Sequence, residues 1–144
     1  MNVFIIGTPL ETAKILDKRR LNKQIIECKQ ILKALSGESK AWANHPATIQ
    51  YIGHEKWLED YTCCLMWYDL GDIKKAEAYS KLCDTRKPEF HIEEYFTQMK
   101  RRLYTKNNEY YKQWEYLGTS DINWYFVNGC WKFYKSGKTI KESL

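Results

Sequence analysis

The chain has 144 residues, which is enough for one domain with a single hydrophobic core. Its 23 Lys and Arg residues against 18 Asp and Glu residues give a formal charge of +5, a bias towards polyanionic partners that falls well short of a histone-like excess. Aromatic residues make up 15% of the chain, and such side chains build dense cores and also stack on nucleic-acid bases.

The composition carries no targeting, membrane or metal-binding signal. The N-terminal run MNVFIIGTPL is apolar over only a few residues and lacks a basic n-region, and no stretch approaches transmembrane length. The five cysteines include no Cys-x-x-Cys pair, and the three histidines are not spaced against them as zinc ligands would be. We therefore expect a cytoplasmic protein with reduced, structural thiols, no metal and no membrane contact.

The first predicted helix follows a short extended arm. In FIIGTPLETA, Thr8 is suited to cap the helix, Pro9 to fill its first turn and Glu11 to complement its dipole. From there an apolar stripe runs at alternating spacings of four and three: Leu21, Ile25, Cys28, Leu32 and Leu35. We predict a helix near 10–35 that ends before Gly37 and buries this stripe.

Three further helical segments are predicted. The first lies near 46–70, bends at Gly53 and buries Leu58 and Leu65. The second, DIKKAEAYSKLC, is shorter and is capped by Asp72. The third is basic and lies near 92–116. The tail TSDINWYFVNGCWKFYKSGK is assigned to helix interrupted at Gly129, because no alternating strand pattern is recognised. The predicted fold is all-α: a compact single domain over residues 1–144, with three main helices and additional short ones.

One carboxylate, Glu27, lies in an otherwise cationic stretch of the first helix. Arg20, Gln24, Glu27 and Ile31 follow one another at spacings of three and four, so they share a flank between the core and the solvent, where the wall of a cleft would lie. Glu27 is either an ordinary surface residue paired with Lys23 or the acid of a nucleic-acid-binding site. The pattern alone leaves both interpretations open.

These residues resemble the pyrimidine dimer DNA glycosylase family, typified by endonuclease V. The resemblance covers residues 1 to about 71 and rests on the N-terminal arm, on the run ILDKRRLNKQIIECKQILKAL and on WANHPA. Within these stretches the matching residues are Phe4, Leu16, Asp17, Leu21, Lys23, Gln24, Glu27, Trp42, His45 and Pro46.

The resemblance implies a DNA glycosylase with abasic-site lyase activity on damaged or modified bases, acting on double-stranded DNA without a cofactor, in a bacterial or phage-infected cell. An N-terminal α-amine would attack C1′ of the damaged nucleotide, and Glu27 would stabilise the resulting imine and assist strand cutting. The amine would belong to Met1, or to Asn2 after removal of Met1, and His45 falls on a histidine of the family. The expected nucleic-acid-binding residues are Arg20, Lys23, Gln24, Lys100, Arg101 and Arg102.

The sequence departs from the family pattern in ways that favour an alternative. Asn2 is not the small residue that normally permits removal of Met1, and Phe96 and Met99 replace a His-x-x-His pair of bacterial relatives. Ile26 and Gln30 replace basic residues that flank the glutamate in endonuclease V. The alternative is a non-catalytic nucleotide- or nucleic-acid-binding module on the same fold, acting in a phage–host conflict.

The resemblance does not assign a role to the basic run at residues 100–106 or to Trp42. The basic run KRRLYTK, residues 100–106, is either a strip of phosphate contacts or a solvated helix face. Trp42 is expected to cover the core where the first and second helices meet.

Overall fold

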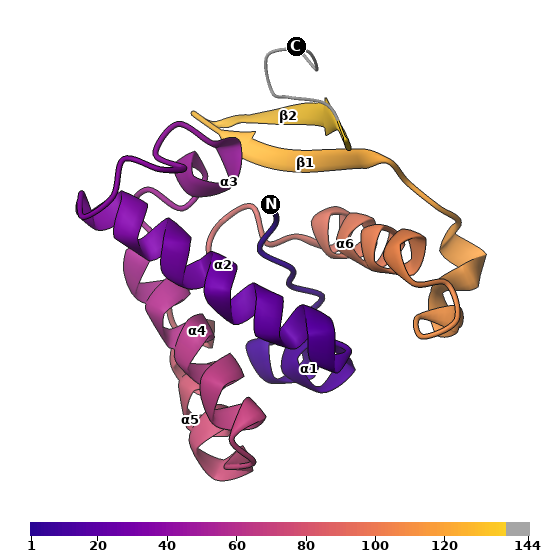
Figure 1. Cartoon of the computed structure of the whole chain (residues 1–144), viewed down its shortest axis with the longest axis horizontal. Coiled ribbons are helices and arrows are strands. Elements are labelled where there is room, and N and C mark those ends of the chain that lie inside the picture. Colours follow the sequence, from indigo (N-terminus) through magenta and orange to yellow (C-terminus); the bar gives the residue numbers. More distant parts are fainter. Residues whose placement is uncertain (138–144) are drawn as a thin grey trace.

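The computed structural model describes residues 1–137, and this part of the chain is mostly helical. The helices are α1 (Pro9–Ile15), α2 (Lys18–Ser36), α3 (Pro46–Ile49), α4 (Glu55–Asp69), α5 (Ile73–Asp84), α6 (Glu93–Lys106) and the 3₁₀ helix η1 (Lys112–Leu117). Strands β1 (Ile122–Val127) and β2 (Cys130–Lys135) then form an antiparallel hairpin (Figure 1). The predominance of helix is confirmed, but the prediction of an all-α fold is wrong in this hairpin. None of the helices over these residues is long and apolar enough to cross a membrane.

The predicted first helix is two helices. The Thr8 side chain caps α1 by accepting a hydrogen bond from the backbone N–H of Glu11 at 3.2 Å, as predicted. Leu16 and Asp17 are extended and separate α1 from α2. The break is held by a tertiary contact, because the backbone N–H of Asp17 donates to the hydroxyl of Tyr111 at 3.0 Å instead of continuing the helix.

The second and fourth predicted helices are also interrupted. Gly53, at φ 88°, lies in the turn between α3 and α4, so the expected bend is a complete break. Helix α6 ends at Asn107, whose side-chain oxygen accepts from the backbone N–H of Tyr110, and η1 follows as a separate turn. The shorter helix is confirmed: the Asp72 carboxylate caps α5 by accepting from the N–H of Lys75.

The segment read as an interrupted helix is the β-hairpin. Asn128 and Gly129 join the strands, and both have positive φ, 53° and 77°, as a type I′ turn requires. Gly129 is therefore the second turn residue between two strands, and the prediction that it interrupts a helix is wrong.

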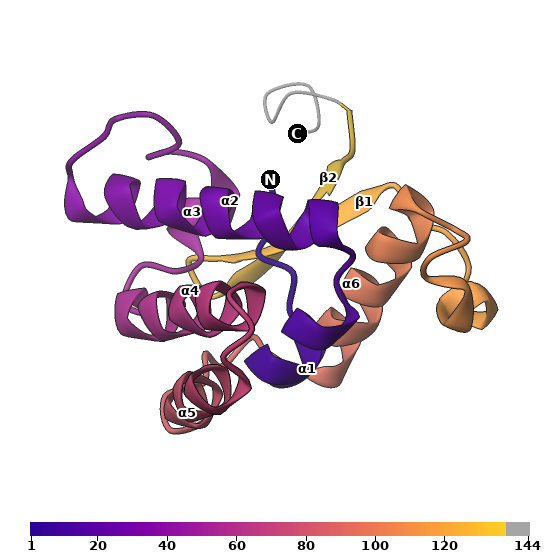
Figure 2. The same ribbon diagram turned by 60° about the horizontal axis from the view of Figure 1, so that its bottom comes forward.

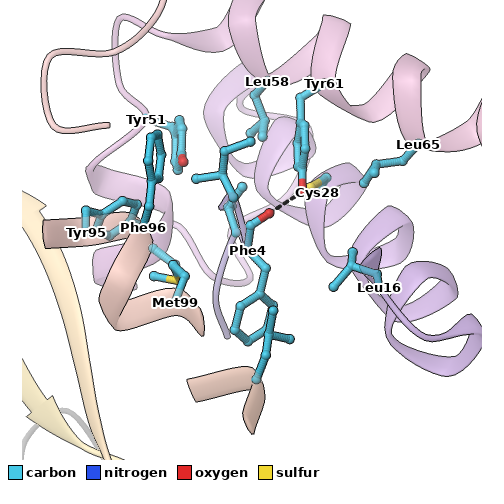
Figure 3. Close-up of a cluster of buried hydrophobic side chains, with 14 of the residues drawn as sticks. Phe4, Leu16, Cys28, Tyr51, Leu58, Tyr61, Leu65, Tyr95, Phe96 and Met99 are labelled. Carbon is cyan, nitrogen blue, oxygen red and sulfur yellow. Dashed lines mark hydrogen bonds between the residues drawn. The ribbon is translucent and has the colours of Figure 1, made fainter. Parts of the chain in front are cut away.

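The N-terminal arm, residues 1–8, runs through the middle of the molecule. In Figure 1 the N-terminus lies between α2, α6 and the hairpin, and Figure 2 shows the arm descending from α2 to α1. Val3, Phe4 and Ile5 are buried, and the Tyr61 hydroxyl of α4 donates to the backbone oxygen of Phe4 (Figure 3). The arm is thus part of the core.

The face that α2 buries is rotated from the predicted stripe. Leu21, Leu58 and Leu65 are buried as predicted, but Ile25 and Leu32 are only half-buried at the edge of the core. Gln24 and Ile31 are buried instead. The polar Gln24 faces inward because it bonds to the arm: its Nε2 donates to the backbone oxygen of Asn2 at 2.9 Å, and its Oε1 accepts from the N–H of Phe4.

We predict that Gln24→Ala destabilises the protein by roughly 1–3 kcal/mol for each backbone group left without a partner. The substitution leaves the oxygen of Asn2 and the N–H of Phe4 unpaired in the interior. Denaturant unfolding will measure the loss as a lower midpoint at an unchanged slope. Gln30→Ala, at an exposed position of the same helix, is the matched control and should change stability by less than about 0.5 kcal/mol. Equal stability of the two variants would contradict the role assigned to Gln24.

Candidate active site

A cavity of about 150 Å³ lies beside the amino terminus. It is lined by Met1, Asn2, Phe4, Arg19, Arg20, Lys23, Gln24, Glu27 and Lys106. Four of these residues are cationic and one, Glu27, is acidic. The cavity thus brings together most of the predicted N-terminal site: Met1, Asn2, Arg20, Lys23, Gln24 and Glu27.

Two elements hold the terminal residue in place. From α2, Gln24 bonds to the backbone of Asn2 and Phe4. From β1, the Tyr125 hydroxyl donates to the backbone oxygen of Met1 at 2.7 Å, and the Asn2 side-chain amide donates to the Asn123 side-chain oxygen at 2.9 Å. The amine is therefore fixed between a helix and a hairpin that are about a hundred residues apart in the sequence.

The surroundings of the Met1 α-amine favour its neutral form. Burial lowers the pKa of this amine below its ordinary value of 8.0, and the positive charges of Lys106, Lys23 and Arg102 lower it further. The negative charge of Glu27 acts in the opposite direction. Because only a neutral amine attacks carbon, the lowered pKa increases the fraction of this amine that is in the form required of a nucleophile.

Glu27 lies at the edge of the cavity with its side chain 15% exposed. Its nearest ion pair is with Lys23, at 3.8 Å between Nζ and Oε1. Arg20 bonds to Asp17 at 3.2 Å, one helical turn before it. The ion pair of the Glu27 carboxylate is therefore weak, because its N–O distance is 3.8 Å and the Lys23 side chain is 69% exposed.

His45, predicted as a catalytic residue, is not among the residues that line the cavity and lies against the ring of Tyr125. Its Nδ1 accepts from the backbone N–H of Ala47 at 3.0 Å and caps α3, so the proton of the neutral ring is assigned to Nε2. Burial, and then the positive charge of the Met1 amine, lower the pKa of His45 to about 4. The ring is thus neutral at pH 7, with its edge against Tyr125 at 5.8 Å between centroids.

The basic run 100–106 does not form one surface. Arg102 is buried, and its guanidinium donates to the backbone oxygen of Ser120 at 2.6 Å and to the Ser136 hydroxyl at 3.1 Å. Arg101 donates to the backbone oxygen of Thr119 at 3.1 Å, and Lys100 is half-exposed away from the cavity. Of this run Lys106 alone lines the cavity, whereas Arg101 and Arg102 bind the segments at either end of the hairpin.

Four of the departures from the family pattern lie outside the cavity, whereas the fifth, Asn2, lines it. Phe96 and Met99 are 6% and 1% exposed within the core, near Tyr51 and Tyr95 (Figure 3). Ile26 and Gln30 are exposed on α2. None of these four residues lines the cavity beside the amine.

The expected position of Trp42 as a cover of the core is wrong. Its side chain is 44% exposed, and its contact is with the edge of His45 at 5.6 Å between ring centroids. The chain turns at this residue, whose φ is 65°.

Sequence reasoning missed four residues of the site: Arg19, Lys106, Asn123 and Tyr125. Arg19 and Lys106 lie in basic runs whose individual members cannot be ranked without a fold. Asn123 and Tyr125 were placed on a helix, and only the hairpin turn Asn128-Gly129 would have put both of them on the same face of a strand.

Comparison with known proteins finds a family match over the N-terminal part of the chain. Residues 1–67 match the model of the pyrimidine dimer DNA glycosylase family. The resemblance seen in the sequence is thereby confirmed, and the matched segment contains Met1, Glu27 and His45. It ends within α4, so α6 and the hairpin lie beyond it. No curated protein and no solved structure gives a significant match.

We predict that Lys106→Met raises the pKa of the Met1 amine, because a positive charge that lowers it is removed. Glu27→Gln should shift this pKa in the opposite direction, since it removes the charge that raises it. The pH dependence of amine acylation under limiting reagent, with the modified residue located by mass spectrometry, measures both shifts. Lys112→Met, on exposed η1, is the control and should leave the profile unchanged. Shifts of the same sign for Lys106 and Glu27 would refute this electrostatic assignment.

Proposed function

We propose that the protein is a DNA glycosylase with associated abasic-site lyase activity, acting on a damaged or modified base. The observation that carries this proposal is the α-amine of Met1, which lines a cavity with Glu27 and has a lowered pKa. The family match over residues 1–67 supports glycosylase chemistry and DNA as the substrate.

The proposed reaction uses the amine as the nucleophile. The neutral nitrogen of Met1 forms a bond to C1′ as the glycosidic bond breaks, and the base departs with the bonding electrons and takes up a proton. Opening of the sugar ring gives a protonated imine, whose positive charge the Glu27 carboxylate stabilises. Removal of a C2′ proton then expels the 3′ phosphate, which cuts the strand.

The charges around the cavity suit a nucleic-acid backbone. Arg19, Lys23 and Lys106 each present a cation beside the amine, and Arg19 and Lys23 are exposed on α2. Cations at such positions neutralise phosphates and fix the register of the strand without reading its sequence. Double-stranded DNA is the proposed partner, with the target nucleotide extruded so that C1′ reaches the amine.

The size of the cavity favours a second candidate function. About 150 Å³ surrounded by four cations is a space suited to a phosphate group or one small moiety of a nucleotide. A non-catalytic module that binds a nucleotide or nucleic acid through the same residues would use the amine as a further cation. In that case no covalent bond to the sugar forms.

Borohydride trapping on a duplex with an abasic site separates the two functions. An imine-forming enzyme becomes covalently attached to the DNA, and mass spectrometry of the adduct is expected to place the bond at the α-nitrogen. Acetylating that amine, or adding a few residues ahead of Met1, should abolish trapping and leave salt-sensitive DNA binding in place.

Each outcome of this experiment has a definite meaning. A bond at Lys23 would show that a side chain supplies the amine and would refute the role of Met1. No adduct from a protein with a free terminus, on abasic and base-modified duplexes alike, would support the binding module instead.

We predict that Glu27→Gln retains DNA affinity but slows strand cutting roughly 10²- to 10³-fold, the cost of removing one charge-stabilising group from a transition state. Affinity should hold or tighten slightly, because a negative charge near the phosphates is lost. Single-turnover cutting of abasic DNA and binding to an uncleavable duplex measure the two effects separately. Glu38→Gln, at an exposed position beyond α2, is the control. Cutting by Glu27→Gln at the parent rate would make this residue a surface ion-pair partner only.

A further inference from the structure

Trp42 combines two unfavourable features for the folded protein. Its φ of 65° lies in the left-handed region, which a bulky residue adopts only under strain, and its large apolar side chain is 44% exposed. Within residues 1–137, Asn128 is the other non-glycine residue with positive φ, and asparagine tolerates this conformation in a hairpin turn. Trp42 therefore has no comparable local reason to be a tryptophan.

The turn around Trp42 does not need an indole. The backbone N–H of His45 donates to the oxygen of Trp42 at 3.0 Å, and the N–H of Ala43 donates to the oxygen of Lys40 at 3.3 Å. A glycine at position 42 would form these same bonds without the steric cost of a Cβ. The side chain is thus unexplained by the fold of the loop.

The position of the indole connects it with the amine. The rings of Trp42 and His45 form a T-shaped contact with 5.6 Å between their centroids, and the rings of His45 and Tyr125 form another at 5.8 Å. The Tyr125 hydroxyl in turn donates to the Met1 backbone oxygen. The charge of the Met1 amine in turn influences His45. Trp42 is therefore separated by one side chain, His45, from the tyrosine that holds Met1, and part of its surface is open to solvent.

We propose that Trp42 stacks on a nucleobase of the bound DNA next to the reacting nucleotide. The indole then fills the gap left by base extrusion or supports the displaced base. This inference rests on the proposed function, since it adds a base contact to the same site. Stacking on an indole suits any base, because each base has a flat π face, and it offsets part of the cost of unstacking the duplex. The strain at Trp42 is then a consequence of presenting a rigid aromatic surface to the bound DNA.

The test uses a duplex with a tetrahydrofuran abasic analogue opposite 2-aminopurine, on which no imine forms. At fixed salt, Trp42→Gly is expected to weaken binding on the order of tenfold and to raise the 2-aminopurine fluorescence of the complex. Its thermal midpoint should equal or exceed that of the parent, because strain is relieved. Trp42→Phe, which keeps an aromatic ring, should retain most of the affinity.

Tyr116→Ala removes an aromatic ring that is 78% exposed on η1, and this control should leave affinity unchanged. Affinity and fluorescence of Trp42→Gly equal to those of the parent would overturn the inference, as would an equal loss of affinity in Tyr116→Ala. If borohydride trapping fails but Trp42→Gly still binds more weakly, the base contact stands and the lyase function falls. If trapping succeeds and Trp42→Gly binds as the parent does, the lyase function stands and the base contact falls.

Discussion

The structure depends on burial of the first residues of the chain. Backbone groups cannot be buried without hydrogen-bond partners, so the arm requires polar side chains inside the core. Gln24 supplies both a donor and an acceptor, and the Tyr61 hydroxyl supplies one more donor. These bonds explain why an amide occupies the inward face of α2, and they fix the α-amine of Met1 at the edge of the core, where it is partly shielded from water but still borders a cavity.

This placement also determines the electrostatics of the site. Desolvation and three neighbouring cations each disfavour a charged amine, and Glu27 alone among the named charges favours it. Cations attract phosphates, so the charges that would bind a polyanion in the proposed function also favour the neutral form of the amine. Glu27 has the converse effect: its charge disfavours the neutral amine, and in the proposed reaction it would stabilise the cationic imine. A single carboxylate amid positive charges therefore suits the cationic imine of the proposed reaction better than it suits the free neutral amine.

Features of the fold that depend on neighbouring residues could be predicted from the sequence, whereas those that depend on tertiary contacts could not. Caps at Thr8 and Asp72 are local and were identified, whereas the breaks at Asp17 and Gly53 depend on tertiary contacts or on a turn that helical periodicity does not reveal. The inward face of α2 was misplaced because Gln24 was counted as polar, although its partners lie on another segment. The hairpin lacked alternation because aromatic residues occupy both faces of β1, Trp124 and Phe126 on one and Tyr125 on the other. Its Asn-Gly turn was the signal that would have identified it.

The candidate site is divided between two parts of the chain that carry different information. Met1, Glu27 and His45 belong to the segment that matches the glycosylase family, so their types and spacing were accessible from the sequence. Lys106 and Tyr125 belong to the remainder; one influences the charge state of the amine and the other holds its residue in position. A resemblance confined to the first segment can therefore indicate candidate reacting groups, but residues outside that segment also influence the pKa and position of the proposed nucleophile. For this reason the hairpin is as much a part of the site as α2, although it carries none of the proposed reacting groups.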